Sequence, residues 1–118
     1  MDFEFTKEQL MFKKEVVRFA QKEIVPRVQE HDLKEAFDFA SFRKLGEFGI
    51  LGLHFPEEYG GEGADVVTTV LAGEALGEAG VDGGLTLAYG AHSFLCADTI
   101  FRHANEALKR KYIPKLAS

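Results

Sequence analysis

The sequence predicts an all-α domain, a bundle of about five helices, from three observations. Apolar residues recur at three- and four-residue spacing through most of the chain. No stretch of useful length alternates apolar and polar side chains as a half-buried strand would. Polar capping residues and glycines stand where these periodic segments begin and end. Because the chain has no internal repeat and no low-complexity segment, we expect its helices to pack as one bundle.

The first helix is predicted from residue 6 to about residue 30. Thr6 and Gln9 have the spacing of a capping box at its start. Pro26 lacks a backbone N–H, so it predicts a kink or an end of the helix nearby. A short second helix should begin after the N-cap Asp38 and end at Gly49 in a left-handed conformation.

The third helix is predicted between the N-cap Asp65 and the terminating Gly80. Gly73 and Gly77 are four residues apart, and each lowers helix propensity, so we expect a close packing contact that compensates. Its buried side is expected to consist of Val66, Val67, Val70, Leu71, Ala75 and Ala79.

The fourth helix is predicted from about Gly84 to His103, with its start at Asp82. It is apolar nearly all round, which predicts a central position in the bundle. Asn105 can cap a last helix that ends near Pro114 or Ala117.

Residues 56–63 form a loop with three glycines, which indicates backbone angles or close approaches that a Cβ atom would forbid. Tyr59 could pack beneath this loop and bond its hydroxyl there, or face a ligand, and the structural role is favoured. Glu57 and Glu58 are adjacent, so they are expected to be solvated, or to bond the loop backbone, rather than to converge on a substrate.

Composition and charge narrow the class of protein. The 118 residues are 46% hydrophobic, which suits one globular domain over residues 1–118 and contains no run as long as a membrane span. A single cysteine cannot form an internal disulfide, so a reducing compartment fits best. No Lys or Arg lies between Lys44 and Arg102, a region rich in acids, so binding of nucleic acid or coenzyme phosphates there is disfavoured.

Few residues are candidates for catalysis or metal binding. No Cys/His spacing is typical of zinc, and we expect no metal site. His54 and His92 are the two histidines of interest, and each is more readily a surface or hydrogen-bonded structural residue than an acid–base group. Cys96 is expected to be a buried apolar thiol.

Several segments resemble one family in order and spacing. They are residues 5–9 (FTKEQ), 18–20 (RFA), 24–26 (IVP), 45–53 (LGEFGILGL), 56–63 (PEEYGGEG) and 111–117 (KYIPKLA). Together they resemble the N-terminal helical domain of acyl-CoA dehydrogenases over nearly the whole chain. Since the chain stops where members of that family run on, we expect a piece of a longer protein.

The resemblance implies an FAD-dependent α,β-dehydrogenation of an acyl-CoA thioester, with a carboxylate that removes the α-proton and a flavin that accepts the hydride. In that family a β-rich middle domain and a C-terminal helical domain hold most flavin contacts and the catalytic glutamate. We therefore place no catalytic or cofactor-binding residue here, and expect this chain alone to be inactive and to bind FAD weakly or not at all. The resemblance also implies an electron-transfer flavoprotein as partner, a homo-oligomer, and a bacterial cytoplasm or, second, a mitochondrial matrix.

On periodicity alone, Thr86, Leu87, Gly90 and Phe94 belong to the core, because an apolar helical stripe is usually packing. The resemblance gives them a second reading, since the matching part of the fourth helix lines the acyl-chain pocket in that family. We therefore predict these four as substrate-binding residues, with Gly90 leaving room for a longer or bulkier acyl group. The stripe has two faces, and the sequence leaves open which one the pocket takes.

Two other functions compete. An acyl-CoA oxidase could use the same scaffold, and the oxygen reactivity of the reduced flavin would separate the two. A free-standing helical binding or assembly module is the third reading, and the intact mass of the native protein would test it.

Overall fold

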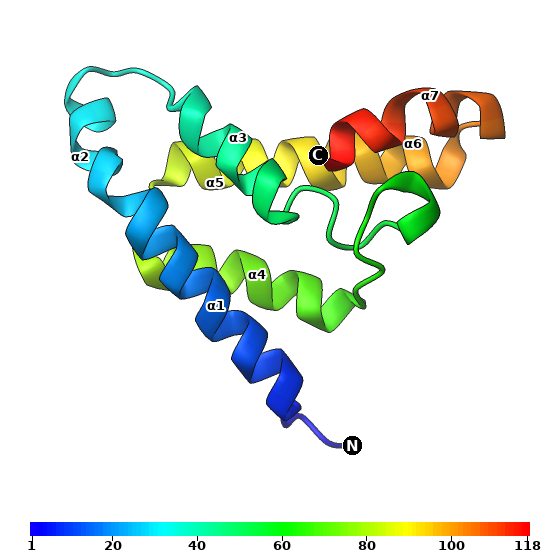
Figure 1. The fold of residues 1–118 in the computed structure, drawn as a ribbon, viewed down its shortest axis with the longest axis horizontal. Helices are drawn as coiled ribbons and strands as arrows, with labels where there is room; N and C mark the ends of the chain where they lie inside the picture. Colours follow the sequence, from blue (N-terminus) through cyan, green and yellow to red (C-terminus); the bar gives the residue numbers. More distant parts are fainter.

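The computed structural model describes residues 1–118 and is all-helical, as predicted (Figure 1). Three of its segments, α5, a π-helical turn η2 and α6, run on without interruption, so the chain folds into six helices rather than five. The elements are α1 (Lys7–Glu23), α2 (Val25–Leu33), α3 (Phe39–Phe48), a short 3₁₀ turn η1 (Glu57–Tyr59), α4 (Val66–Ala79), α5 (Gly83–Gly90), η2 (Ala91–Ala97), α6 (Asp98–His103) and α7 (Glu106–Ala117).

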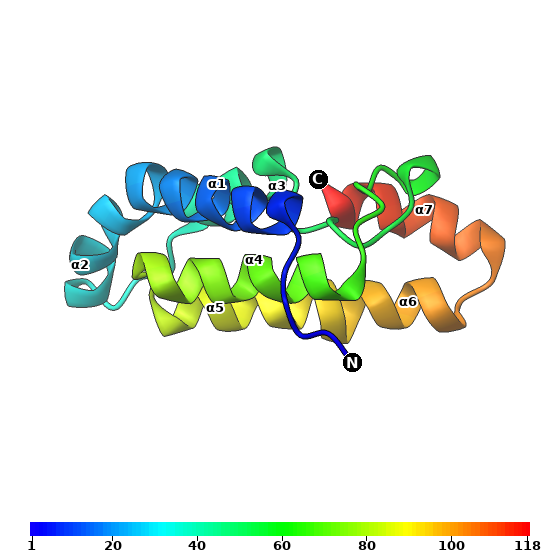
Figure 2. The same ribbon diagram turned by 90° about the horizontal axis from the view of Figure 1, so that it is seen from below.

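The helices form two layers (Figure 2). One layer holds α1, α3 and α7, and the other holds α4 together with the long α5–η2–α6 helix. The molecule measures 42 × 37 × 21 Å, and 21 Å is the thickness of two helices with their side chains. No helix is both long enough and apolar enough to cross a membrane.

The additional helix arises at the predicted proline. The first helix ends at Glu23, and Ile24 has φ −116°, outside the ideal helical range. Pro26 then stands in the first turn of α2, where its missing N–H costs no hydrogen bond. The predicted break is therefore confirmed, and it separates two helices.

The predicted helix caps are confirmed. Thr6 and Gln9 form both hydrogen bonds of the capping box. Asp38, Asp65, Asp82 and Asn105 each accept a hydrogen bond from a backbone N–H three residues on. Gly49 and Gly80 end their helices at φ +98° and +99°.

Two hydrophobic clusters hold the layers together. The first, called here the main core, joins α1, α3, α4 and α5 and contains Val16, Ala20, Ile24, Leu45, Ile50, Leu51, Ala75, Leu76, Ala79, Val81, Leu85 and Tyr89. The second, called here the loop core, lies under the glycine loop and contains Phe55, Tyr59, Ala97, Ile113 and Ala117.

Two predictions of burial are wrong in part. On α4, Leu71, Ala75 and Ala79 are buried, but Val66, Val67 and Val70 are exposed. On the long helix, Leu87 and Leu95 are 73% and 75% exposed, so this helix is not surrounded by the bundle. Both helices are apolar on most sides, so their periodicity cannot identify the face that packs.

A close packing contact was predicted at each of the two glycines of α4, and the structure confirms it at only one. A Cβ atom on Gly73 would lie 3.8 Å from the ring of Tyr89, so α5 packs against α4 at this position. A Cβ on Gly77 would meet nothing within 4 Å, so the expected contact is absent there.

Candidate functional site

The four predicted substrate-binding residues lie on one side of the long helix. Steps of 100° per residue place Thr86, Leu87 and Gly90 within an arc of about 100°. Phe94 lies four residues after Gly90, close to one full turn of the π-helical segment, so it falls on the same side. Thr86 donates its hydroxyl to the Asp82 carbonyl at 2.9 Å, so its methyl group and Leu87 supply the apolar surface. A Cβ on Gly90 would meet no atom within 4 Å, so the surface beside it is open.

Phe94 connects this face to the buried side of the helix. Its ring lies 5.6 Å from that of Tyr89 in an edge-to-face arrangement and 5.4 Å from that of His54. Tyr89 is buried and its hydroxyl has no hydrogen-bond partner. Burial raises the pKa of Tyr89 to about 12, so the hydroxyl stays neutral.

A groove of about 300 Å³ runs beside Phe94, between the start of α4 and α6. Its walls are apolar, and its polar groups come from residues far apart in the sequence. The lining residues are His54, Val66, Thr69, Val70, Phe94, Asp98 and Arg102. Two of the exposed valines of α4, Val66 and Val70, therefore form part of one wall of this groove.

His54 has a partner that the sequence did not indicate. Its Nε2 lies 3.3 Å from Oδ1 of Asp98, whose Oδ2 accepts a hydrogen bond from Arg102 at 2.6 Å. The Nε2 contact lacks hydrogen-bond geometry, so this buried atom is unsatisfied. Burial lowers the pKa of His54, and the Asp98 carboxylate opposes that change.

Structural roles were predicted for His92 and Cys96, and the structure confirms only the one for His92. The Nε2–H of His92 donates to the Leu116 carbonyl at 2.7 Å, which confirms a hydrogen-bonded structural histidine. Cys96 is exposed, so the prediction of a buried thiol is wrong. The π-helical turn places Ser93 and Ala97 inward, and Cys96 falls on the outer side.

The glycine loop is held by close backbone approach. A Cβ on Gly61 would lie 2.0 Å from the Phe55 carbonyl oxygen, and Gly60 has φ +86°. Tyr59 is buried, but its hydroxyl donates to Glu106 on α7 at 2.7 Å rather than to the loop. This hydrogen bond confirms the structural role of Tyr59, but its partner is Glu106 and not the loop that the sequence predicted.

The two loop acids do not converge on a common point. Glu58 pairs with Arg110 at 3.4 Å, and Arg110 also pairs with Glu106 at 2.9 Å. Glu57 opens the η1 turn on the exposed surface. Both acids are exposed, so the expectation that they are solvated is confirmed, and Glu58 also forms this ion pair.

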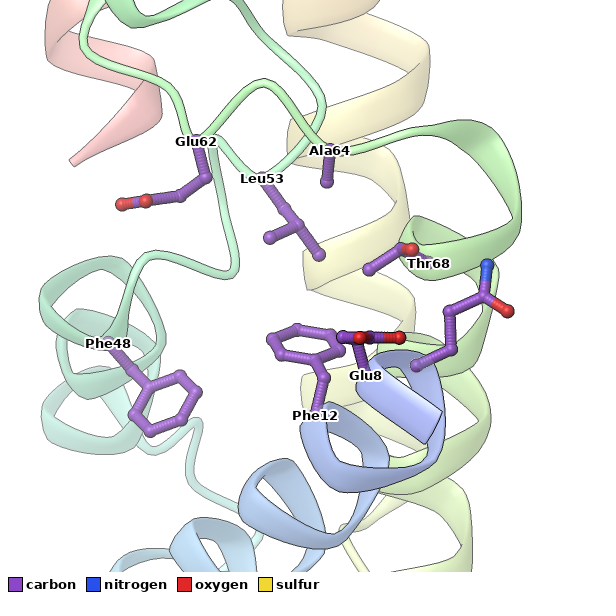
Figure 3. Close-up of a pocket in the computed structure, with 8 residues that line it drawn as sticks. Glu8, Phe12, Phe48, Leu53, Glu62, Ala64 and Thr68 are labelled. Carbon is purple, nitrogen blue, oxygen red and sulfur yellow. The ribbon is translucent and has the colours of Figure 1, made fainter. Parts of the chain in front are cut away.

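The largest hollow lies elsewhere, between α1, α3 and the loop before α4 (Figure 3). It has a volume of about 490 Å³, and Phe12, Phe48 and Leu53 surround it, with Glu8 and Glu62 at its edge. An apolar surface beside two carboxylates suits an apolar group and repels phosphate. The two carboxylates therefore disfavour the phosphate-bearing part of a coenzyme in this hollow.

Helix N-termini are the other common binding sites for phosphate. The N-termini of α3, α4 and α5 are each capped by an aspartate carboxylate. Each carboxylate accepts a hydrogen bond from an N–H group that could bind phosphate, and it adds negative charge. These three helix starts therefore do not suit the diphosphate of FAD.

Comparison with known proteins agrees with the all-helical fold. The sequence model described as "Acyl-CoA dehydrogenase, N-terminal domain" matches residues 6–118. "Probable acyl-CoA dehydrogenase YngJ" of Bacillus subtilis is 41% identical over 118 residues, covering 100% of this chain and 30% of that protein.

Two solved structures match nearly all of the chain. Butyryl-CoA dehydrogenase from Megasphaera elsdenii matches with a TM-score of 0.89 and 36% identity, over 99% of this chain and 31% of that one. A chain described as "Electron transferring flavoprotein of Acidaminococcus fermentans: Towards a mechanism of flavin-based electron bifurcation" matches with a TM-score of 0.91 and 40% identity, over 99% of this chain and 30% of that one.

These matches show that the chain is an all-helical domain of the acyl-CoA dehydrogenase type. The chain belongs to the acyl-CoA dehydrogenase family and corresponds to the N-terminal domain of its members. It spans about 30% of the length of the relatives it matches.

Proposed function

We propose that this chain is part of an enzyme that dehydrogenates the α,β bond of an acyl-CoA thioester, and that it walls one side of the acyl-chain pocket. The observation that carries the proposal is the family match over residues 6–118. The open side of the long helix supports the pocket assignment, because Leu87 is 73% exposed and a Cβ on Gly90 would meet nothing within 4 Å. Phe94 adds a partly exposed ring to the same side.

The reacting groups belong to the rest of the protein in this proposal. The stretch between Lys44 and Arg102 has no basic residue, and aspartates cap the helices that begin in it, so phosphate is disfavoured there and FAD is expected to be held by the further domains. The role of this domain is to bind and orient the acyl chain and to exclude water from it. Residues 1–118 alone are expected to be inactive.

Gly90 gives the sharpest test of the pocket. In the full-length flavoprotein, Gly90→Val should shift the preferred acyl chain to a shorter one, because the new side chain fills open space on the pocket side. Anaerobic titration with acyl-CoAs of graded length, followed by bleaching of the flavin absorbance, measures that preference.

Gly77→Val is the matched control. It also places a valine on a helical glycine with nothing within 4 Å, but on α4 and away from the proposed pocket. An unchanged chain-length profile in Gly90→Val, or equal shifts in both variants, would contradict the pocket assignment. Failure of every acyl-CoA to bleach the flavin would contradict the enzyme proposal itself.

The proposed partners follow from the same assignment. Electrons would leave the full-length enzyme through an electron-transfer flavoprotein, and we expect the enzyme to be a homo-oligomer. The bacterial cytoplasm is the preferred compartment, and the mitochondrial matrix is the second choice. The oxidase alternative predicts rapid reoxidation of the reduced flavin by oxygen. The alternative of a free-standing binding module predicts a native protein with the intact mass of this chain alone.

A further inference from the structure

The groove beside Phe94 continues the open side of the long helix toward α6. Phe94 lines the groove and also lies on the same side of the helix as Gly90, so the two surfaces meet at its ring. The facing wall comes from α4, which lies in the same layer as the long helix (Figure 2). That wall carries Val66 and Val70, which are 73% and 62% exposed. The groove therefore presents apolar surface that this chain leaves uncovered.

The polar groups of the groove do not require a charged ligand. The Asp98 carboxylate is paired with Arg102 at 2.6 Å, so the two charges offset each other. The Thr69 hydroxyl already donates to the Asp65 carbonyl at 2.8 Å. Nε2 of His54 is buried, so a ligand in the groove does not reach it. An uncharged, apolar group is the occupant that suits this lining.

The order of residues along the long helix indicates how an apolar chain would lie in the groove. Gly90, Phe94 and Asp98 follow one another at four-residue intervals, and Arg102 continues the series. The end of the groove at Phe94 is therefore nearer Gly90, and the ion pair lies toward the other end. An apolar chain should enter past Gly90 and stop before the ion pair, because covering the two charges would remove water from them.

The size of the groove, about 300 Å³, limits what it can hold. Ligand pockets usually measure about 300–1,000 Å³, so this space suits part of a ligand rather than a whole acyl-CoA. We propose that the groove takes the far end of a long, uncharged acyl chain, and that Val66 and Val70 of α4 are specificity-determining residues. This inference rests on the proposed function and extends the pocket from the long helix to α4.

A bulkier residue on the α4 wall tests the proposal in the full-length flavoprotein. Val70→Phe fills the groove, so it should weaken the apparent affinity for palmitoyl-CoA by about tenfold and leave that for butyryl-CoA unchanged. Anaerobic titrations followed by bleaching of the flavin absorbance give both affinities. Val67→Phe is the matched control, because Val67 is exposed on the same helix but does not line the groove.

A double variant separates a chain-binding groove from a contact between domains. In Gly90→Val the acyl chain should no longer reach the groove, so adding Val70→Phe should change no affinity further. Equal losses for palmitoyl-CoA and butyryl-CoA in Val70→Phe would overturn the inference and make this wall a domain contact.

The parent enzyme separates a failure of this inference from a failure of the proposed function. Bleaching by butyryl-CoA but not by palmitoyl-CoA would overturn the inference and leave the proposed function standing. Absence of bleaching by acyl-CoAs of every length would overturn both.

Discussion

The main core and the loop core hold the same domain together by different means. The main core contains twelve buried residues, nearly all aliphatic, contributed by helices that lie along one another. The loop core has five, and its residues also form hydrogen bonds, including Gly63 N to the Phe55 carbonyl at 2.8 Å and the Tyr59 hydroxyl to Glu106 at 2.7 Å.

The difference shows where each region is vulnerable. The stability of the main core depends on buried apolar volume, so removing carbon atoms weakens it. The loop core depends on how closely backbone segments approach, and Gly52 and Gly61 leave no space for even one added carbon. Their added Cβ atoms would lie 2.4 Å from the Ala117 Cβ and 2.0 Å from the Phe55 carbonyl oxygen.

The largest expected effect is a loss of volume in the main core. Leu45 is fully buried, and Leu45→Ala should lower the free energy of unfolding by about 4 kcal/mol. Urea denaturation measures the change. Leu95→Ala removes the same atoms from an exposed site and should change stability by less than about 0.5 kcal/mol. Equal effects in the two variants would mean that the main core is not packed as described.

An added carbon should break the loop core. Gly61→Ala forces the Phe55 carbonyl away and should cost about 3 kcal/mol, because the contact atom is backbone and cannot rotate aside. Gly77→Ala adds the same carbon to an open helical site and should raise stability, by up to about 1 kcal/mol. If Gly61→Ala were as stable as the parent, the loop would have no need for close approach.

Acid should weaken the contact between α2 and the start of α3, which depends on one ion pair. Arg27 donates two hydrogen bonds to Asp38, at 2.8 and 3.1 Å, and thereby lowers the pKa of that carboxyl well below its usual range. A lowered carboxyl pKa stabilises the fold above the unfolded value, near 3.9, and that stability is lost as the pH falls further.

Asp38→Asn should therefore cost about 2 kcal/mol at pH 7 and flatten the loss of stability below about pH 4. Denaturation measured from pH 7 to pH 2 checks both parts. Asp32→Asn changes an exposed acid on α2 and should leave the pH profile as it is. A parent-like acid profile in Asp38→Asn would assign the acid sensitivity to other carboxyls.

The smallest expected change in stability concerns one hydrogen bond of the loop core. Tyr59→Phe removes the hydrogen bond to Glu106 and should cost about 1 kcal/mol, since Glu106 is exposed and can turn to water. Thermal unfolding resolves such a change when it is compared with Tyr112→Phe, because Tyr112 is 42% exposed. A larger loss would mean that Tyr59 holds α7 in place through more than this bond.

Local chemistry made most of the fold predictable. Each helix start at Thr6, Asp38, Asp65, Asp82 and Asn105 depends on a side chain that bonds its own backbone three residues on. The glycine ends at Gly49 and Gly80 depend on backbone angles that other residues avoid. These signals lie within a few residues of the feature that they predict.

Features that depend on distant contacts could not be predicted in the same way. The partner of His54 is 44 positions away at Asp98, and that of Tyr59 is 47 positions away at Glu106. The exposed valines of α4 look like core in the sequence because nothing local marks which face packs. The four residues predicted for the acyl pocket share one face, and their role in substrate binding stays a prediction.

The π-helical turn η2 has a consequence for which sequence changes the domain tolerates. A π turn holds more residues per turn than an α-helix, so it takes up one extra residue without turning the residues that follow it. Deleting one residue within Ala91–Ala97 would restore regular α-helix and leave α6 and α7 in about the same orientation relative to α5. A deletion inside a regular helix such as α4 would instead rotate all that follows by about 100°. Single-residue deletions should therefore be tolerated better within this turn than within α4.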